Sequence, residues 1–155
     1  ENKVSTGKLD ASLLYETLER RHSIGVILVT WGSYSIGVFE GENLLESKTG
    51  TGYIHKRHRK GGRSARRFAR RTEEQKKDFL RKVSNRIEER FENYSLDCIF
   101  FGGNRFILKL LLTECKYLES EAHRISERIL NVRYGDRETL EGSLKEITKC
   151  LVFSY

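Results

Sequence analysis

The sequence of 155 residues lacks the features that define several large classes of protein. It contains no methionine and begins at Glu1, so we expect a processed or excised piece, possibly of a longer protein. Its longest apolar run, residues 24–31, is far shorter than the roughly 20 residues that span a bilayer. We also find no secretory leader. These absences predict a soluble protein.

Cysteine is scarce, and its placement excludes two further classes. Cys98, Cys115 and Cys150 are odd in number, widely spaced and never part of a Cys-x-x-Cys pair. This pattern predicts neither a disulfide framework nor a zinc site, and it suits a reducing, cytoplasmic location. His22 and His123 are isolated from other residues of ligand type, so we expect no metal and no cofactor. Cys98 lies in an apolar run and is expected in the core rather than as a nucleophile.

The length fits a single domain, residues 1–155, and the hydrophobic periodicity divides it into alternating strands and helices. The predicted elements are, in order, a helix at 9–21, strands at 24–31, 34–40 and 44–49, a helix at 65–92, a strand at 96–101, helical spacing over 106–118, a strand at 129–134 and a helix at 140–151. Gly32-Ser33 is a two-residue hairpin signal between the first two strands. The later strands need helical crossovers and are therefore expected to be parallel. The fold class is α/β, with a mixed sheet of about five strands and helices on both faces.

Positive charge is concentrated in residues 53–71. This segment holds nine Lys and Arg residues and no carboxylate, and without them the remaining 20 of 29 basic residues would be outnumbered by 22 acidic ones. Such local charge predicts a polyanionic partner, although a solvated basic run or a nuclear-targeting tract is the alternative. The pair Gly61-Gly62 inside the run favours nucleic acid, because glycine allows a close backbone approach that a Cβ would prevent.

The helix that follows this segment is predicted to be amphipathic, with Ser64 as a possible N-cap. Four arginines fall in one sector of the helical wheel: Arg66, Arg67, Arg70 and Arg71. The apolar residues on the opposite side are Ala65, Phe68, Ala69, Phe79, Leu80, Val83, Ile87 and Phe91. One continuous helix is therefore expected to bury an apolar stripe and present the arginines outward.

Other candidate sites are weaker. Gly102-Gly103 follows a predicted strand, but it lacks the spacing of a dinucleotide-binding loop and the Lys-Ser/Thr of a P-loop, so we interpret it as a strand-to-helix turn. The topology invites comparison with ribonuclease H folds, whose nucleases hold metal ions with carboxylates that begin on the first strand. Residues 24–31 contain no acid, which disfavours a nuclease of that kind. Glu40, Glu42 and Glu46 are expected to face solvent at strand ends.

Residues 55–70, His-Lys-Arg-His-Arg-Lys-Gly-Gly-Arg-Ser-Ala-Arg-Arg-Phe-Ala-Arg, resemble the catalytic loop of archaeal and eukaryotic class 1 peptide-chain release factors. Those proteins have a basic tract, then Gly-Gly-Gln-Ser, then a long helix that begins with Ala, Arg and Phe-Ala-Arg. The predicted strands and the Val-Arg-Tyr-Gly at 132–135 also follow the family's order. The resemblance runs from about residue 24 onward and extends to the release-factor-like domains of ribosome quality control.

The resemblance implies a ribonuclease H-like, release-factor middle-domain topology and a ribosome-associated protein. The loop would reach the acceptor end of peptidyl-tRNA and promote hydrolysis of the peptidyl ester, in translation termination or in the rescue of stalled ribosomes. The implied partners are large-subunit rRNA and peptidyl-tRNA, together with flanking domains or a GTPase that this piece does not contain. The implied catalytic residues are Gly61, Gly62 and Arg63. The implied RNA-binding residues are His55, Lys56, Arg57, His58, Arg59, Lys60, Ser64, Arg66, Arg67, Arg70 and Arg71.

Arg63 is the main departure from the family, whose third motif residue is glutamine. Arginine keeps the backbone N–H that would stabilise the reacting ester, but it has no side-chain acceptor. Its charge would instead contact a tRNA phosphate or a developing oxyanion. The alternative is a non-catalytic ribosome- or tRNA-binding paralogue, and a nuclease acting on the acceptor end is a third hypothesis. His55 and His58 are interpreted as RNA contacts rather than as a general base.

Overall fold

The computed structural model describes residues 12, 15, 20–55 and 63–149. The helix expected at 9–21 therefore lies almost wholly outside the described residues. Within them, no helix is both long enough and apolar enough to cross a membrane.

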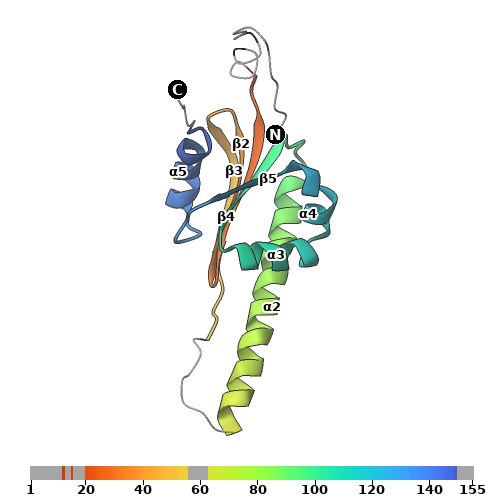
Figure 1. Cartoon of the computed structure of the whole chain (residues 1–155), viewed down its shortest axis with the longest axis vertical. Coiled ribbons are helices and arrows are strands. Elements are labelled where there is room, and N and C mark those ends of the chain that lie inside the picture. Colours follow the sequence, from red (N-terminus) through yellow and green to blue (C-terminus); the bar gives the residue numbers. More distant parts are fainter. Residues whose placement is uncertain (1–11, 13–14, 16–19, 56–62, 150–155) are drawn as a thin grey trace, which may run out of the picture.

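A five-stranded mixed sheet forms the centre of the domain, in the order β3-β2-β1-β4-β5 (Figure 1). The strands are β1 (Ser23–Thr30), β2 (Ser33–Glu40), β3 (Asn43–Thr51), β4 (Cys98–Gly103) and β5 (Ile125–Leu130). The first three form an antiparallel meander, whereas β4 runs parallel to β1 and β5 runs parallel to β4. The expected parallel pairing of the later strands is confirmed.

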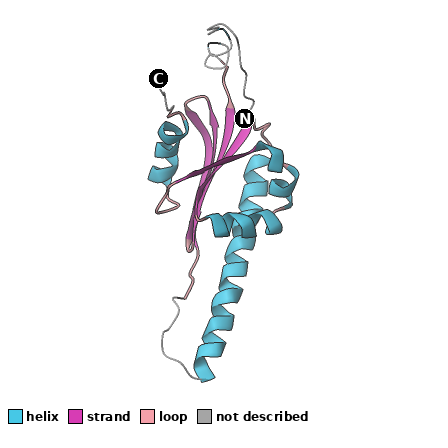
Figure 2. Cartoon of the chain, in the orientation of Figure 1, coloured by secondary structure: helices cyan, strands magenta, loops and turns pink. Residues whose placement is uncertain are grey.

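Helices cover both faces of this sheet (Figure 2). The helices are α2 (Arg63–Phe91), α3 (Arg105–Glu114), α4 (Lys116–Ser120) and α5 (Arg137–Ile147), with a 3-10 turn at Ala122–Arg124. Residues of α2, α3 and α4 pack on one face and α5 on the other. The predicted α/β fold class, with about five strands and helices on both faces, is confirmed.

The alternation of side chains along β1 divides the core in two. Ile27 and Val29 point into the larger cluster under α2, and Val26 and Leu28 point into the smaller cluster under Leu140 of α5. Both faces of this strand are buried because successive side chains alternate across a sheet that is covered on both sides. Because a carboxylate is costly to bury, β1 contains no acidic residue.

The first hairpin turn lies one residue earlier than predicted. Thr30 pairs with Ser33, so the two-residue loop is Trp31-Gly32 rather than residues 32–33. Gly32 has a φ of 97°, the left-handed conformation that short hairpin loops require. The Thr30 and Ser33 hydroxyls lie 2.8 Å apart and close the turn.

The last strand differs more from the prediction. β5 spans Ile125–Leu130, and residues 131–134 of the expected strand at 129–134 belong to the connection into α5. The final pairing joins Leu130 to Gly102, because β4 ends at Gly103, where a φ of 118° turns the chain into α3. The apolar residues beyond Leu130 therefore have no strand to pair with.

Three helix boundaries also need correction. The helical pattern over 106–118 is divided at Cys115, whose extended backbone ends α3 and begins α4. The last helix ends at Ile147, within the predicted range of 140–151. The α2 helix begins at Arg63, so Ser64 lies inside the helix and is not its N-cap.

We expect the two ends of α2 to differ sharply in their contribution to stability. Phe91 is fully buried, and Phe91→Ala should lower the free energy of unfolding by about 3–5 kcal/mol. Phe68 is 42% exposed, and Phe68→Ala should cost less than about 1 kcal/mol. Urea unfolding of the two variants measures the difference. Equal losses would show that the start of α2 belongs to the cooperative core.

Candidate nucleic-acid interface

The α2 helix is longer than the sheet on which it packs. Its 29 residues extend about 44 Å, but the first residue in its buried core stripe is Phe79. We call residues 63–78, which precede this contact, the arm; they extend about 24 Å. Figure 1 shows the arm projecting past the edge of the sheet at which β4 gives way to α3.

The apolar stripe predicted along the whole helix is buried only in its second part. Leu80, Val83, Ile87 and Phe91 are buried with Phe79 in the larger core cluster. In the arm, Ala69 is exposed, Ala65 is half-buried and Phe68 is largely exposed. The reason is that the sheet ends near Thr51, so the arm has no strand beneath it.

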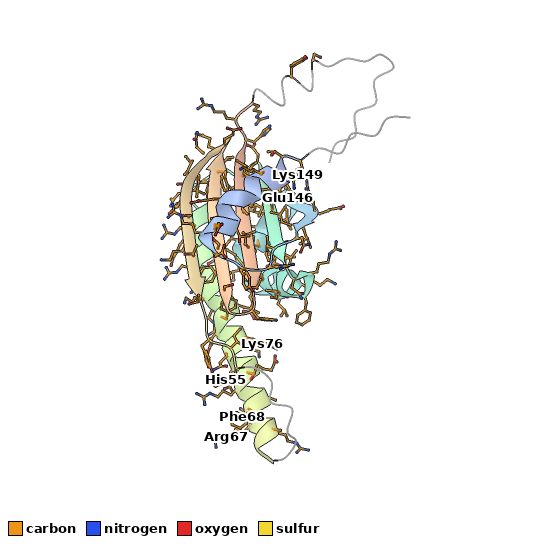
Figure 3. The ribbon with its side chains drawn as sticks, turned by 90° about the vertical axis from the view of Figure 1, so that its left-hand side faces the viewer. His55, Arg67, Phe68, Lys76, Glu146 and Lys149 are labelled. Atoms are coloured by element: carbon orange, nitrogen blue, oxygen red, sulfur yellow. The ribbon has the colours of Figure 1, made fainter. Side chains whose placement is uncertain are left out.

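The predicted outward position of the four arginines is confirmed. Arg66, Arg67, Arg70 and Arg71 are all exposed, and Figure 3 shows Arg67 close to the free end of the arm. Arg70 forms an ion pair with Glu74 at 3.3 Å. Among the described residues, the other three form no ion pair with a carboxylate, so their charge is available to a ligand.

The chain that leaves β3 is held against α2. The N–H of Gly52 donates to the carbonyl of Gly32 at 2.9 Å. A Cβ at Gly52 would lie only 2.5 Å from the ring of Phe79, so glycine is needed for this close approach. Farther along, the N–H of His55 donates to Oε1 of Gln75 at 3.0 Å. These contacts tie residues 52–55 to the base of the arm.

Aromatic and cationic side chains surround the junction, the place where residues 52–55 meet the base of the arm. The Tyr53 hydroxyl lies 3.3 Å from Nδ1 of His55, and the two rings meet edge to face at 4.8 Å. Lys76 lies over the ring of Trp31 at 5.3 Å from its centroid. Gln75 and Tyr53 were missed by sequence reasoning, because only the folded contacts connect them with the basic segment. His55, an expected RNA contact, is thereby held at the base of the arm (Figure 3).

Most of the predicted catalytic loop lies outside the described residues. These positions are Lys56, Arg57, His58, Arg59, Lys60, Gly61 and Gly62. Arg63 and Ser64 are the first two residues of α2. Chain connectivity thus places the Gly-Gly pair directly before the arm. The first turn of α2 contains no acid, which leaves the positive end of its helix dipole uncompensated.

Several residues considered as candidate ligands have structural partners instead. His22 lies outside any helix, just before β1, with Nδ1 3.9 Å from the Asp97 carboxylate. Glu46 does not simply face solvent, because it forms an ion pair with Arg90 of α2, whereas Glu40 and Glu42 are exposed as expected.

The described thiols and carboxylates show no arrangement for metal chemistry. Cys115 is buried and Cys98 half-buried, and burial raises the pKa of both thiols above the ordinary value, which keeps them protonated. In the part of the chain that the structure describes, no three His, Cys, Asp or Glu residues are grouped to hold a metal ion.

Comparison with known families identifies the domain. Residues 22–152 match the family described as Actinobacteria/chloroflexi VLRF1 release factor. The chain belongs to this release-factor family. The resemblance inferred from residues 55–70 is thus confirmed at the level of the family.

Curated relatives agree with this assignment. The chain is 27% identical over 141 residues to eukaryotic peptide chain release factor subunit 1 of Oxytricha trifallax, covering 89% of this chain and 32% of the relative. It is 26% identical over 141 residues to peptide chain release factor subunit 1 of Aeropyrum pernix, covering 88% and 38%. The chain therefore spans about a third of the length of these relatives.

Solved structures confirm the fold. The archaeal translation termination factor aRF1 superposes with a TM-score of 0.64 at 18% identity, covering 92% of this chain and 39% of that one. The mitochondrial localization core of Vms1 superposes with a TM-score of 0.59 at 15% identity, covering 98% and 69%. The release-factor middle-domain topology is thus established.

The Gln75 contact makes a prediction about the junction. Gln75→Ala removes the acceptor for the His55 N–H and should accelerate hydrogen exchange of that amide about 2- to 10-fold. Gln75→Glu keeps an acceptor oxygen and should preserve slow exchange. NMR-detected exchange measures both variants. Unchanged protection of His55 in Gln75→Ala would show that this hydrogen bond does not hold the segment.

Proposed function

We propose that this domain docks on the ribosome and presents Gly61-Gly62-Arg63 to the acceptor end of peptidyl-tRNA, where it promotes hydrolysis of the peptidyl ester. The observation that carries the proposal is the arm: a projecting helix with unpaired arginines that begins at Arg63, in a chain of a release-factor family. We infer a role in termination or rescue in the cytoplasm, with large-subunit rRNA and peptidyl-tRNA as partners.

The arm is suited to enter a narrow, phosphate-lined space. A single helix is about 10–12 Å wide with its side chains, much narrower than the covered sheet behind it. Arg66, Arg67 and Arg71 bring three charges that no described carboxylate neutralises. The basic tract of residues 56–60, which precedes the arm in the sequence, adds further positive charge. Phosphate contacts of this kind would position the domain without reading sequence.

The chemistry assigned to the loop is ester hydrolysis. A water molecule attacks the ester carbonyl, the bond from that carbon to the tRNA ribose oxygen breaks, and the ribose oxygen takes up a proton. In this scheme the backbone N–H of Arg63 donates to the developing oxyanion, and the adjacent glycines allow the close approach. The arginine side chain cannot accept a hydrogen bond from the attacking water, but it binds phosphate or the oxyanion.

A second candidate function is favoured by the same residue. If the water must be held by an acceptor at the third motif position, Arg63 leaves the loop able to bind but not to hydrolyse. The domain would then occupy the acceptor site or sense a stalled ribosome. Membership of a release-factor family supports the placement on a ribosome in either case. A release assay separates the two functions.

The arm makes a prediction about RNA affinity. The triple variant Arg66→Ala, Arg67→Ala, Arg71→Ala should bind ribosomal RNA at least about tenfold more weakly near 0.1 M salt, with a salt slope smaller by about two. Its free energy of unfolding should not fall, because the three side chains are exposed and their charges oppose the helix dipole. The matched control is Arg21→Ala, Lys116→Ala, Lys145→Ala, which removes three exposed charges elsewhere.

Fluorescence anisotropy over a salt series measures both triple variants. The control should retain affinity within about twofold, because its charges lie outside the arm. Equal losses in the two variants would mean that total charge, rather than the arm, governs RNA binding.

Arg63 separates hydrolysis from binding alone. If the backbone N–H carries the chemistry, Arg63→Gln should raise peptide release by adding an acceptor, and Arg63→Ala should retain activity. Gly62→Val should lower release at least about a hundredfold, because the β-branched residue blocks the approach of the backbone donor. The assay measures peptide freed from ribosomes that carry peptidyl-tRNA. Failure of both the wild type and Arg63→Gln to release peptide while still binding would establish the non-catalytic function.

A further inference from the structure

Two Arg-aromatic pairs lie at one edge of the sheet, outside the arm. They are Arg105-Phe106 at the start of α3 and Arg133-Tyr134 after β5, and we call these four residues the edge patch. Phe106 is 60% exposed and Tyr134 is 66% exposed, and both arginines are exposed as well. Large aromatic side chains at such exposure contribute little to the core.

Folding brings the two pairs to the same edge. β4 and β5 are parallel, so the residues that follow their carboxyl ends emerge together. Asn104 fixes the first pair as the N-cap of α3, because its side chain accepts the Phe106 N–H at 2.8 Å. Gly135 fixes the second pair by donating its N–H to the Ser33 hydroxyl at 3.1 Å.

The pairing of the strands gives the distance between the chain at Gly103, just before the first pair, and the chain at Gly135, just after the second. A Cβ added at Gly135 would lie only 2.7 Å from the Cα of Tyr34, so the two backbone segments are in close contact. Tyr34 pairs with Val29 across one strand spacing, and Val29 pairs with Gly103 across a second. Two spacings amount to about 10 Å. The backbone at Gly103 and Gly135, beside which the two pairs lie, is therefore close enough for one stretch of RNA to contact both pairs.

The charge of this surface is not neutralised by ion pairs. Among the described residues, neither Arg105 nor Arg133 forms an ion pair, whereas the nearby Arg137 is paired with Glu141 at 2.8 Å. Asp136 is an adjacent acid, and its carboxylate accepts the Thr139 N–H at 2.8 Å as the N-cap of α5. Glu138 follows in the first turn of that helix. Each exposed aromatic residue thus follows directly, in the chain, an exposed arginine that has no ion pair among the described residues.

We propose that the edge patch binds an unpaired stretch of RNA, with bases stacked on Phe106 and Tyr134 and phosphates contacted by Arg105 and Arg133. Exposed aromatic rings beside cations are the arrangement that binds single-stranded nucleic acid with little sequence preference. The proposal rests on RNA docking as the proposed function and adds a second surface to it. The arm leaves the domain at the same edge and α3 packs against α2, so one RNA partner can contact both (Figure 1).

The test uses the whole chain and a fluorescent single-stranded RNA of about 12 nucleotides. Phe106→Ala with Tyr134→Ala should weaken binding at least about fivefold and leave the salt slope unchanged, because stacking does not release counterions. The matched control is Phe106→Tyr with Tyr134→Phe, which keeps both rings and should keep the affinity. Circular dichroism of each variant confirms that the fold is retained.

Replacing the two arginines of the edge patch should change the salt dependence of binding, which replacing the aromatic residues should not. Arg105→Ala with Arg133→Ala should reduce the salt slope by about 1.4, the value for two phosphate contacts on a single strand. The control Lys116→Ala with Lys145→Ala removes two exposed charges elsewhere. It should leave the affinity within about twofold of wild type and the salt slope unchanged.

The arm triple variant, tested on the same RNA, separates this inference from the proposed function. If the arm variant loses affinity and the folded aromatic double variant binds as the wild type does, the edge patch is not an RNA surface and the arm remains one. If the aromatic variant loses affinity and the arm variant does not, RNA binds the edge patch and the arm proposal fails. An affinity loss in both variants supports two surfaces.

Discussion

The packing of Phe79 where the sheet ends is the constraint on which the presentation of the arm depends. Phe79 meets Tyr34 edge to face at 6.1 Å and Trp31 at 6.3 Å, and it lies so close to Gly52 that no Cβ would fit there. This contact fixes the register of α2 on the sheet. The 16 residues of α2 that precede Phe79 then determine how far Arg63 lies from the sheet and which side of the helix carries the arginines. One turn added to or removed from the arm would move its end by about 5.4 Å.

The arm is helical with little tertiary packing, so local interactions must stabilise it. Its sequence is rich in Arg, Lys, Glu and Gln, which have good helix propensity. The ion pairs of Arg70 with Glu74 and of Lys76 with Glu73 add a few tenths of a kcal/mol each. Five arginines in the first nine residues, without an acid in the first turn, act against the helix dipole. A sequence that accepts this electrostatic cost is better explained by an anionic partner than by the stability of the fold.

Much of the fold followed from the sequence, because the period of the apolar residues changes clearly between strands and helices. The meander, the parallel later strands and the exposed arginines were predicted in this way. It could not be predicted that the apolar stripe of α2 is buried only from Phe79 onward. Helical spacing shows which residues share a face, but not whether another element covers that face. β5 was misplaced for a similar reason: residues 131–134 alternate polar and apolar side chains as a strand does, but β4 ends before they can pair. The Gln75 contact and the edge patch join residues far apart in the chain, which no local pattern reports.

In the proposed function, docking and chemistry depend on different parts of the chain, and this difference bears on Arg63. The proposed docking depends mainly on the exposed arginines of the arm, whose positions are set by the register of α2. Replacing the third motif residue removes one charge but leaves Arg66, Arg67 and Arg71 in place. The proposed chemistry depends on a backbone donor and on the group that holds the attacking water. Of these two, only the group that holds the water is affected by the exchange of an amide for a guanidinium group. A domain of this architecture therefore retains the exposed arginines of the arm whatever residue stands at position 63. Selection for docking alone would preserve the core contact of Phe79 and the unpaired arginines of the arm, whereas selection for hydrolysis would also act on the side chain at position 63.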